Sequence, residues 1–291
     1  MREPLVRHET IKYRQNEPFH IVNATGDNAD DMYVKNSHWH EELEIAYVLH
    51  GNYFHYIDGE CIEATPGRLI VTNCESVHRI DANRENNDPG VIHTIVLIVH
   101  KRFLEENFPQ YKNFWFTNEN KQTRPEIREI MLRFSEYRKR TEHAPNEHLY
   151  MRGLLLQLLY YLYLEGVVDR SNNISLKRQE QIQNVKEILQ YVEKHYREPI
   201  MQADVAKNFY FTPQYFSRYF KQCTGVTFIE HLTNYRINQA RQDLLNTDNR
   251  ISDIARNNGF YDDRCFINAF KKIYHITPLQ YKKAQDPAIK R

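Results

Sequence analysis

The chain has 291 residues, of which 41% are hydrophobic, and a net charge of +1. This length suits two folded domains, and the apolar content excludes a mainly disordered chain. The charge is unevenly distributed, because residues 184–291 contain 17 Lys and Arg against 11 Asp and Glu, a net charge of +6, whereas residues 1–183 carry −5. A basic C-terminal part following an acidic one indicates a polyanionic partner.

The cysteines and the apolar stretches exclude further classes of protein. The four cysteines are far apart and form no C-x-x-C pair, which argues against a zinc ribbon, a thioredoxin-like site and a disulfide scaffold. The charged N-terminus lacks the apolar segment of a secretory signal. The most apolar stretch, residues 149–164, is interrupted by Arg152, Gly153 and Gln157 and falls short of a membrane span. We therefore expect a cytoplasmic protein without a membrane segment.

Residues 20–100 consist of short apolar or alternating runs broken by turn residues. Runs such as LEIAYVLHG and VIHTIVLIV alternate with turn pairs such as Asp58-Gly59 and Pro66-Gly67. Strands and turns at this spacing predict an all-β sandwich or barrel.

The apolar period becomes helical after Arg124. A first helix carries its apolar residues on one face, and a second, after the break at residues 144–146, is apolar on more than one face. This predicts a helical hairpin whose surplus apolar surface is covered by the β domain or by a second subunit. The polar, turn-rich residues that follow predict a linker, to which we assign residues 167–183.

The C-terminal part contains an internal repeat. Residues 203–211 (ADVAKNFYF) align with residues 252–260 (SDIARNNGF) at an offset of 49, and the residues that follow align at an offset of 50. Each copy has the pattern of a short helix, a tight turn and a longer helix with core aromatic residues four apart. The aromatic pairs are Phe216 with Phe220 and Phe266 with Phe270. A plain helical bundle is the alternative, but two matched copies predict two helix-turn-helix units.

Polar side chains lie on the outer face of each longer helix and suit base edges and phosphates. They are Gln214, Ser217, Arg218 and Lys221 in the first unit and Asp263, Arg264, Asn268 and Lys271 in the second. We predict that these eight residues contact DNA.

Residues 184–284 resemble the DNA-binding domain of the AraC/XylS family of transcriptional regulators. The resemblance rests on TPQYFSRYFKQCTGVTF in the first unit and ISDIARNNGFYDDRCFINAFKKIYHITPLQY in the second. It implies that both longer helices enter adjacent major grooves, about 34 Å apart. By position, it assigns base reading to Gln214, Ser217 and Arg218, and to Asp263, Arg264 and Asn268.

Two positions depart from this family pattern. His275 stands where many relatives have glycine, and Asp262 with Asp263 places two negative charges at the start of the second recognition helix. Acidic side chains there can cap the helix or accept from cytosine, but they repel phosphates. We therefore expect the first unit to supply most of the sequence specificity.

A histidine motif lies in the β region. His38, His40 and Glu44 fit the first cupin motif, H-x-H-x3-E-x6-G, and His78 belongs to a second motif that fits only in part. On one strand, the first three would share a face. Imidazoles and a carboxylate suit a divalent metal, and the alternative is a polar pocket wall without metal. Sensory domains of this regulator family resemble cupin enzymes, but many have lost the metal. Because the second motif also fits only in part, we expect effector binding and neither metal nor cofactor. The candidate effector-binding residues are His38, His40, Glu44, Tyr53 and His78.

These features predict a multidomain α and β protein. We expect a cupin-like β-barrel with a helical hairpin over residues 1–166, the linker over 167–183, and an all-α double helix-turn-helix domain over 184–291. The resemblance implies a DNA-binding transcriptional regulator, an activator, that responds to a small-molecule effector of carbohydrate-related chemistry. The expected partners are double-stranded DNA, the effector, a second copy in a homodimer, and RNA polymerase. A metal-dependent cupin enzyme with an accessory helical tail is the alternative, and a DNA-binding architectural protein without a sensor is a further one.

Overall fold

The computed structural model describes residues 17–25, 37–82, 91–119, 122–170 and 176–285, and these form two compact units that divide between Gln183 and Asn184. The predicted linker is not a continuous loop. Val167–Asp169 form strand β9, helix α6 begins at Leu176, and residues 171–175 lie outside the described residues. The proposed domain bounds therefore remain a prediction.

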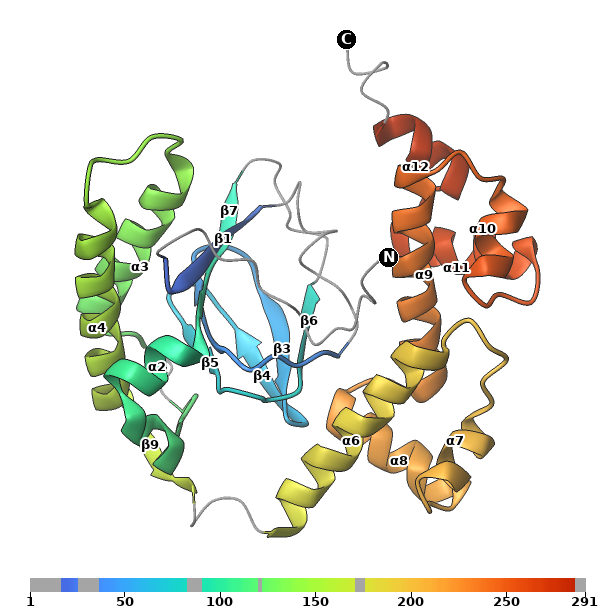
Figure 1. Ribbon diagram of the computed structural model, residues 1–291, viewed down its shortest axis with the longest axis horizontal. Helices are drawn as coiled ribbons and strands as arrows, with labels where there is room; N and C mark the ends of the chain where they lie inside the picture. Colours follow the sequence, from blue (N-terminus) through green and yellow to red (C-terminus); the bar gives the residue numbers. More distant parts are fainter. Residues whose placement is uncertain (1–16, 26–36, 83–90, 120–121, 171–175, 286–291) are drawn as a thin grey trace. The chain divides into compact units, whose positions relative to one another are not determined.

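Two antiparallel sheets form the body of the N-terminal unit (Figure 1). One has the strand order β1-β7-β2-β5 and the other the order β4-β3-β6. The strands are β1 (Phe19–Thr25), β2 (Leu43–Val48), β3 (Tyr53–Ile57), β4 (Glu60–Ala64), β5 (Leu69–Thr72), β6 (His78–Ala82) and β7 (Ile92–Val99). Apolar side chains from both sheets share one buried cluster, so the sheets pack face to face.

Strand β2 shows why the first sheet is buried on both faces. Leu43, Ile45 and Tyr47 belong to a cluster shared with the helical hairpin, whereas Ala46 and Val48 belong to the cluster between the sheets. Alternate residues of a strand point to opposite faces, so both faces of β2 are covered. After β7, the chain continues through α2 (Lys101–Asn107), the 3-10 helix η2 (Pro109–Asn113) and β8 (Phe114–Phe116), which pairs with β9.

The predicted helical hairpin consists of α3 (Pro125–Lys139) and α4 (Glu147–Glu165), and α3 packs against β1 and β7 (Figure 1). Helix α4 buries six apolar residues on its inner face. Its outer face carries Leu149, Tyr150, Leu156, Tyr160, Tyr163 and Leu164, each between 43% and 60% exposed. The surplus apolar surface predicted from the sequence is thus only partly covered within this chain.

The described part of the C-terminal unit is helical. It contains the part of α6 (Leu176–His195) that follows Gln183, then α7 (Gln202–Asn208), α8 (Pro213–Thr224), α9 (Phe228–Asn246), α10 (Ile251–Asn257), α11 (Asp263–Tyr274) and α12 (Pro278–Gln285). The pairs α7–α8 and α10–α11 are the two helix-turn-helix units predicted from the repeat, and α9 joins them (Figure 1). In none of the described segments is a helix both long and apolar enough to span a membrane.

Candidate nucleic-acid interface and effector site

Helix α8 presents the polar side chains predicted to contact DNA. Thr212 caps its N-terminus by accepting from the Tyr215 backbone N–H at 3.3 Å, and Pro213 occupies the first turn. Phe216, Tyr219 and Phe220 are buried on the core side. The opposite side exposes Gln214, Arg218 and Lys221, with Ser217 half-buried. The aromatic spacing thus determines which side chains remain accessible to DNA.

Helix α11 repeats this arrangement with an acidic cap. Asp262 accepts from the Cys265 backbone N–H at 2.7 Å, and hydrogen bonds from Cys265 hold the pKa of Asp262 below its ordinary value. Phe266 and Phe270 are buried. The four predicted contact residues are exposed, namely Asp263, Arg264, Asn268 and Lys271. Capping therefore explains one of the two acidic residues at this helix start.

The turn of the second unit packs tightly against the end of α6 and against α9. The Arg236 guanidinium on α9 donates to the Tyr196 and Glu198 carbonyl oxygens, each at 2.7 Å. Gly259 lies beside this contact with φ +79°, and a Cβ there would come within 2.3 Å of the Tyr196 carbonyl oxygen. Sequence reasoning missed this contact. The repeat offered a signal for it, because it aligns Gly259 with the larger Tyr210 and so marks a position where only the second unit has glycine.

In the β domain, the structure brings four of the five predicted effector residues together. The candidate ligand atoms of His38, His40 and His78 all lie within 4.8 Å of one another. The Glu44 Oε2 atom lies 3.4 Å from His40 Nε2 and 3.7 Å from His78 Nε2. Except for His38, which is half-buried, these side chains are buried. Among the described residues, this histidine group alone is close enough to hold one metal ion.

The local backbone differs from the predicted strand. His38 pairs with His78 through two backbone hydrogen bonds, a bend follows at residues 41–42, and β2 begins only at Leu43. The expectation that one strand carries His38, His40 and Glu44 on one face is therefore wrong. The bend and the strand pairing to His78 bring these residues together instead.

The Nδ1 atoms of His78 and His40 also lie near oxygen atoms that can accept a hydrogen bond. His78 Nδ1 lies 3.0 Å from the Ser76 carbonyl oxygen, and His40 Nδ1 lies 3.6 Å from Glu42 Oε2. A neutral imidazole donates from only one nitrogen. A metal ion in this cluster would compete with protons for the ring nitrogens. Burial opposes ionisation of Glu44, but hydrogen bonds from His40 and His78 outweigh it and hold its pKa well below the ordinary value.

Strand β3 contributes two buried residues, His55 and Tyr53, to the interior of the β domain. His55 on β3 is fully buried, its ring centroid lies 5.9 Å from that of His78, and burial lowers its pKa to about 3. His55 was not predicted from the sequence, although its inward position on an alternating strand was a usable signal. Tyr53, two residues earlier, is buried in the cluster between the sheets and accepts from the Thr94 hydroxyl at 3.3 Å.

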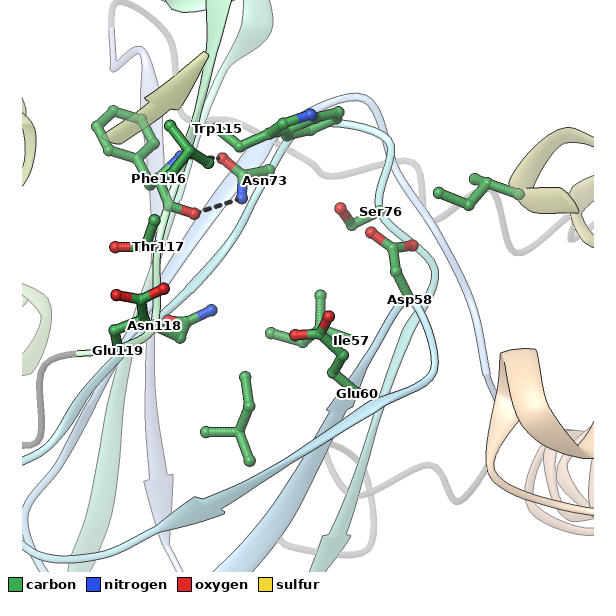
Figure 2. Close-up of a pocket in the computed structure, with 13 residues that line it drawn as sticks. Ile57, Asp58, Glu60, Asn73, Ser76, Trp115, Phe116, Thr117, Asn118 and Glu119 are labelled. Atoms are coloured by element: carbon green, nitrogen blue, oxygen red, sulfur yellow. Dashed lines mark hydrogen bonds between the residues drawn. The ribbon is translucent and has the colours of Figure 1, made fainter. Parts of the chain in front are cut away.

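A cavity of about 390 Å³ lies at the β3–β4 turn. Figure 2 shows Asp58 and Glu60 on one side and the segment Trp115–Glu119 on the other. Asn73 joins that segment to the sheet by exchanging two hydrogen bonds with the Phe116 backbone, of 2.9 and 3.0 Å. The five predicted effector residues are not among the described residues that line this cavity.

Metal content tests the histidine cluster. Because the second cupin motif fits only in part, we expect protein purified without an affinity tag to contain no stoichiometric metal and to keep its melting temperature in a chelator. Near-stoichiometric metal, together with a melting temperature that falls on chelation, would contradict this expectation. The His40→Ala variant is the control, because a chelator effect that arises at this cluster disappears when a ligand is removed.

Comparison with known proteins agrees with both units. Residues 24–159 match the AraC-like ligand binding domain family, and residues 205–284 match a helix-turn-helix domain family. An uncharacterized HTH-type transcriptional regulator of Staphylococcus aureus is 26% identical over 82% of this chain and 31% of its own length. The regulatory protein PocR of Salmonella typhimurium is 34% identical over 34% of this chain and 33% of its own length.

Among solved structures, the C-terminal domain of the response regulator yesN from Fusobacterium nucleatum is 34% identical, with a TM-score of 0.33, and covers 34% of this chain and 98% of that domain. The chain spans about a third of the length of the curated relatives it matches. The chain carries a ligand-binding domain followed by a helix-turn-helix domain, and it belongs to the AraC family of transcriptional regulators.

Proposed function

We propose that this chain is an effector-responsive transcriptional activator that reads specific DNA with α8 and α11. The observation that carries the proposal is the pair of helix-turn-helix units with buried aromatic rings and exposed polar faces. Helix α9 and the Arg236 contacts join the units, which suits binding to two successive major grooves. Arg, Asn and Gln on these faces are side chains that read base edges.

Arg218 and Lys221 are proposed to have different roles on α8. Arg218 is exposed in the middle of α8 and suits a bidentate contact to guanine, whereas Lys221 lies about a turn later and suits a phosphate. The Arg218→Ala variant should lose about 1–3 kcal/mol of binding free energy and relax the preference at one base position. The Lys221→Ala variant should weaken binding to all sequences alike and reduce the salt dependence.

Binding selection from random DNA, repeated at two salt concentrations, measures both effects. The two variants serve as controls for each other, because each removes one positive charge from the same helix. An unchanged consensus for Arg218→Ala would show that this residue does not read a base. Selection of no consensus by the unmodified chain would contradict the proposed function itself.

The outer face of α4 is proposed as the surface that joins two copies of the chain. Leu149, Leu156, Tyr160 and Tyr163 recur at helical spacing on this face and are 43–60% exposed. Their neighbour Gly153 has open space above its Cα. A homodimer would bring two DNA-binding units to paired half-sites, and effector binding in the β domain would alter that arrangement. The activator would then engage RNA polymerase in the cytoplasm.

The proposed effector residues remain His38, His40, Glu44, Tyr53 and His78, the interior groups of the β domain. A metal-dependent enzyme is the second candidate function, and the observation that favours it is the His38, His40 and His78 cluster. The metal measurement described above decides between the two. A DNA footprint that no effector changes would instead favour an architectural role.

A further inference from the structure

The turn between α10 and α11 contains one residue more than the turn between α7 and α8. In each turn a phenylalanine N–H donates to an alanine carbonyl oxygen of the preceding helix, and these two residues, Phe211 and Phe260, are equivalent at the repeat offset of 49. The residues that cap the following helices, Thr212 and Asp262, are equivalent at the offset of 50. Tyr261, which lies between Phe260 and the cap, is therefore the additional residue of the second turn.

The Tyr261 side chain contributes almost nothing to the packing of the C-terminal unit. It is 96% exposed, and Tyr210 in the first turn is 97% exposed, whereas no other large apolar or aromatic side chain in the described segments exceeds 65%. Tyr261 does not cap α11 either, because Asp262 accepts from the Cys265 backbone N–H. An added aromatic residue that neither packs nor caps, in a turn of a binding domain, indicates contact with a partner.

The position of Tyr261 suits a contact with the DNA backbone. In helix-turn-helix proteins the N-terminal residues of the recognition helix contact base edges in the major groove, so the residue before its cap lies at the edge of that groove, near the phosphates. Tyr261 directly precedes Asp262, the cap of α11, and the exposed Asp263 and Arg264 follow. A tyrosine hydroxyl can donate a hydrogen bond to a phosphate oxygen.

The charges at the start of α11 favour an uncharged donor at this point. Asp262 and Asp263 both repel phosphates. The Asp262 cap also occupies a backbone N–H that an uncapped helix could offer to a phosphate. A cationic side chain here would pair with these carboxylates, whereas a phenol hydroxyl stays available to a phosphate. In the first unit the cap is the uncharged Thr212, which adds no repulsion.

We propose that the Tyr261 hydroxyl donates to a backbone phosphate at the edge of the second major groove and holds the start of α11 against the DNA. Tyr261 is then a positioning residue, which fixes where α11 enters the groove and reads no base. Its contact adds affinity for any sequence, which fits the expectation that the first unit supplies most of the specificity. This inference rests on the proposed DNA-reading function and adds a contact to it.

Tyr210 is equally exposed but leaves its turn on a different side. The repeat aligns it with Gly259, and both residues lie in the left-handed region, with φ 59° and 79°. A Cβ on Gly259 would point toward Arg236 of α9, and α9 packs against the buried face of α11 in one apolar cluster. By this equivalence the Tyr210 ring leaves its turn away from the exposed face of α8. Tyr210 is therefore a matched control for Tyr261.

The affinity of the intact chain for its selected consensus DNA, measured at several salt concentrations, tests the proposal. We expect Tyr261→Phe to bind about tenfold more weakly at every salt concentration, because the lost hydrogen bond has a charged acceptor. The salt dependence should be unchanged, because no charge is removed from the protein. The selected consensus should also be unchanged. Tyr210→Phe should bind as tightly as the unmodified chain, and circular dichroism should show the same helical content in all three proteins.

Single methylphosphonate substitutions, which remove the charge of one phosphate at a time, locate the contact. One of them should weaken binding of the unmodified chain about tenfold and leave Tyr261→Phe unaffected. Unchanged affinity of Tyr261→Phe, an altered consensus, an equal loss in Tyr210→Phe, or the same methylphosphonate profile for both proteins would overturn the proposal. These results would leave the DNA-reading function intact. If the unmodified chain selects no consensus, that function fails, and the Tyr261 contact fails with it.

Discussion

The Gly259→Ala variant should lose about 3–5 kcal/mol of stability in the C-terminal unit. The added Cβ would lie 2.3 Å from the Tyr196 carbonyl oxygen and 2.9 Å from Arg236 Nε. The first of these is a backbone atom, so relief requires the end of α6 to move. The backbone at φ +79° adds strain for any residue other than glycine. Urea unfolding measures the loss.

Two spectroscopic signals assign this loss to one unit. Both tryptophans of the chain, Trp39 and Trp115, belong to the N-terminal unit, so their fluorescence follows that unit. Circular dichroism at the helix band includes the helical C-terminal unit. We expect the Gly259→Ala transition to shift in circular dichroism and not in fluorescence. Equal shifts in both signals, or none, would contradict a local steric effect.

The His275→Gly variant is the control, because we expect it to raise the stability of the unit that Gly259→Ala destabilises. His275 ends α11 in the left-handed region with φ 61°, where Gly225 ends α8 with φ 75°. Glycine adopts this conformation without the steric penalty, so the substitution should stabilise the unit by about 0.5–1 kcal/mol. The departure from the family pattern at this position is thus a local cost in stability. A destabilised His275→Gly protein would imply a stabilising contact made by the imidazole.

A pair of charges on α4 should convert a dimer into monomers. Leu156 and Tyr160 are 43% and 60% exposed on the proposed dimer surface. In the Leu156→Glu/Tyr160→Glu variant, opposed carboxylates would repel across the two-fold axis and the apolar contact would be lost. Binding to paired half-sites should weaken by about 100-fold, because the second site loses its effective concentration. Sedimentation measures the mass, and DNA titration measures the affinity.

The helical content of this variant, measured by circular dichroism, should remain unchanged, because both positions lie outside the core. Gln157→Glu is the matched control, since it adds a carboxylate to the same helix at the edge of the apolar face. A double variant that remains dimeric would exclude α4 as the dimer surface. An unmodified chain that sediments as a monomer with its DNA would exclude dimerisation altogether.

The features that the sequence predicted correctly depend on neighbours along the chain. The buried rings of Phe216, Phe220, Phe266 and Phe270 follow from helical periodicity, and the repeat predicts both helix-turn-helix units. The missed features depend on distant pairing. Strand β9 forms because β8 lies beside it, and the bend before β2 accompanies the pairing of His38 with His78. His55 and the cavity were missed because residues distant in sequence form their surroundings.

The contacts of Arg236 and Gly259 have a consequence for the helical phase of the DNA. Helix α9 and the contacts at the Tyr196 carbonyl oxygen hold the units of α8 and α11 together. The second unit therefore has little freedom to follow its DNA segment when that segment is displaced. Inserting about five base pairs between the two contacted DNA segments turns the second major groove to the opposite side of the duplex. Inserting about ten returns it to the same side but a full turn away, beyond the reach of a joined pair. We therefore expect the operator of this chain to be restricted in spacing as well as in sequence.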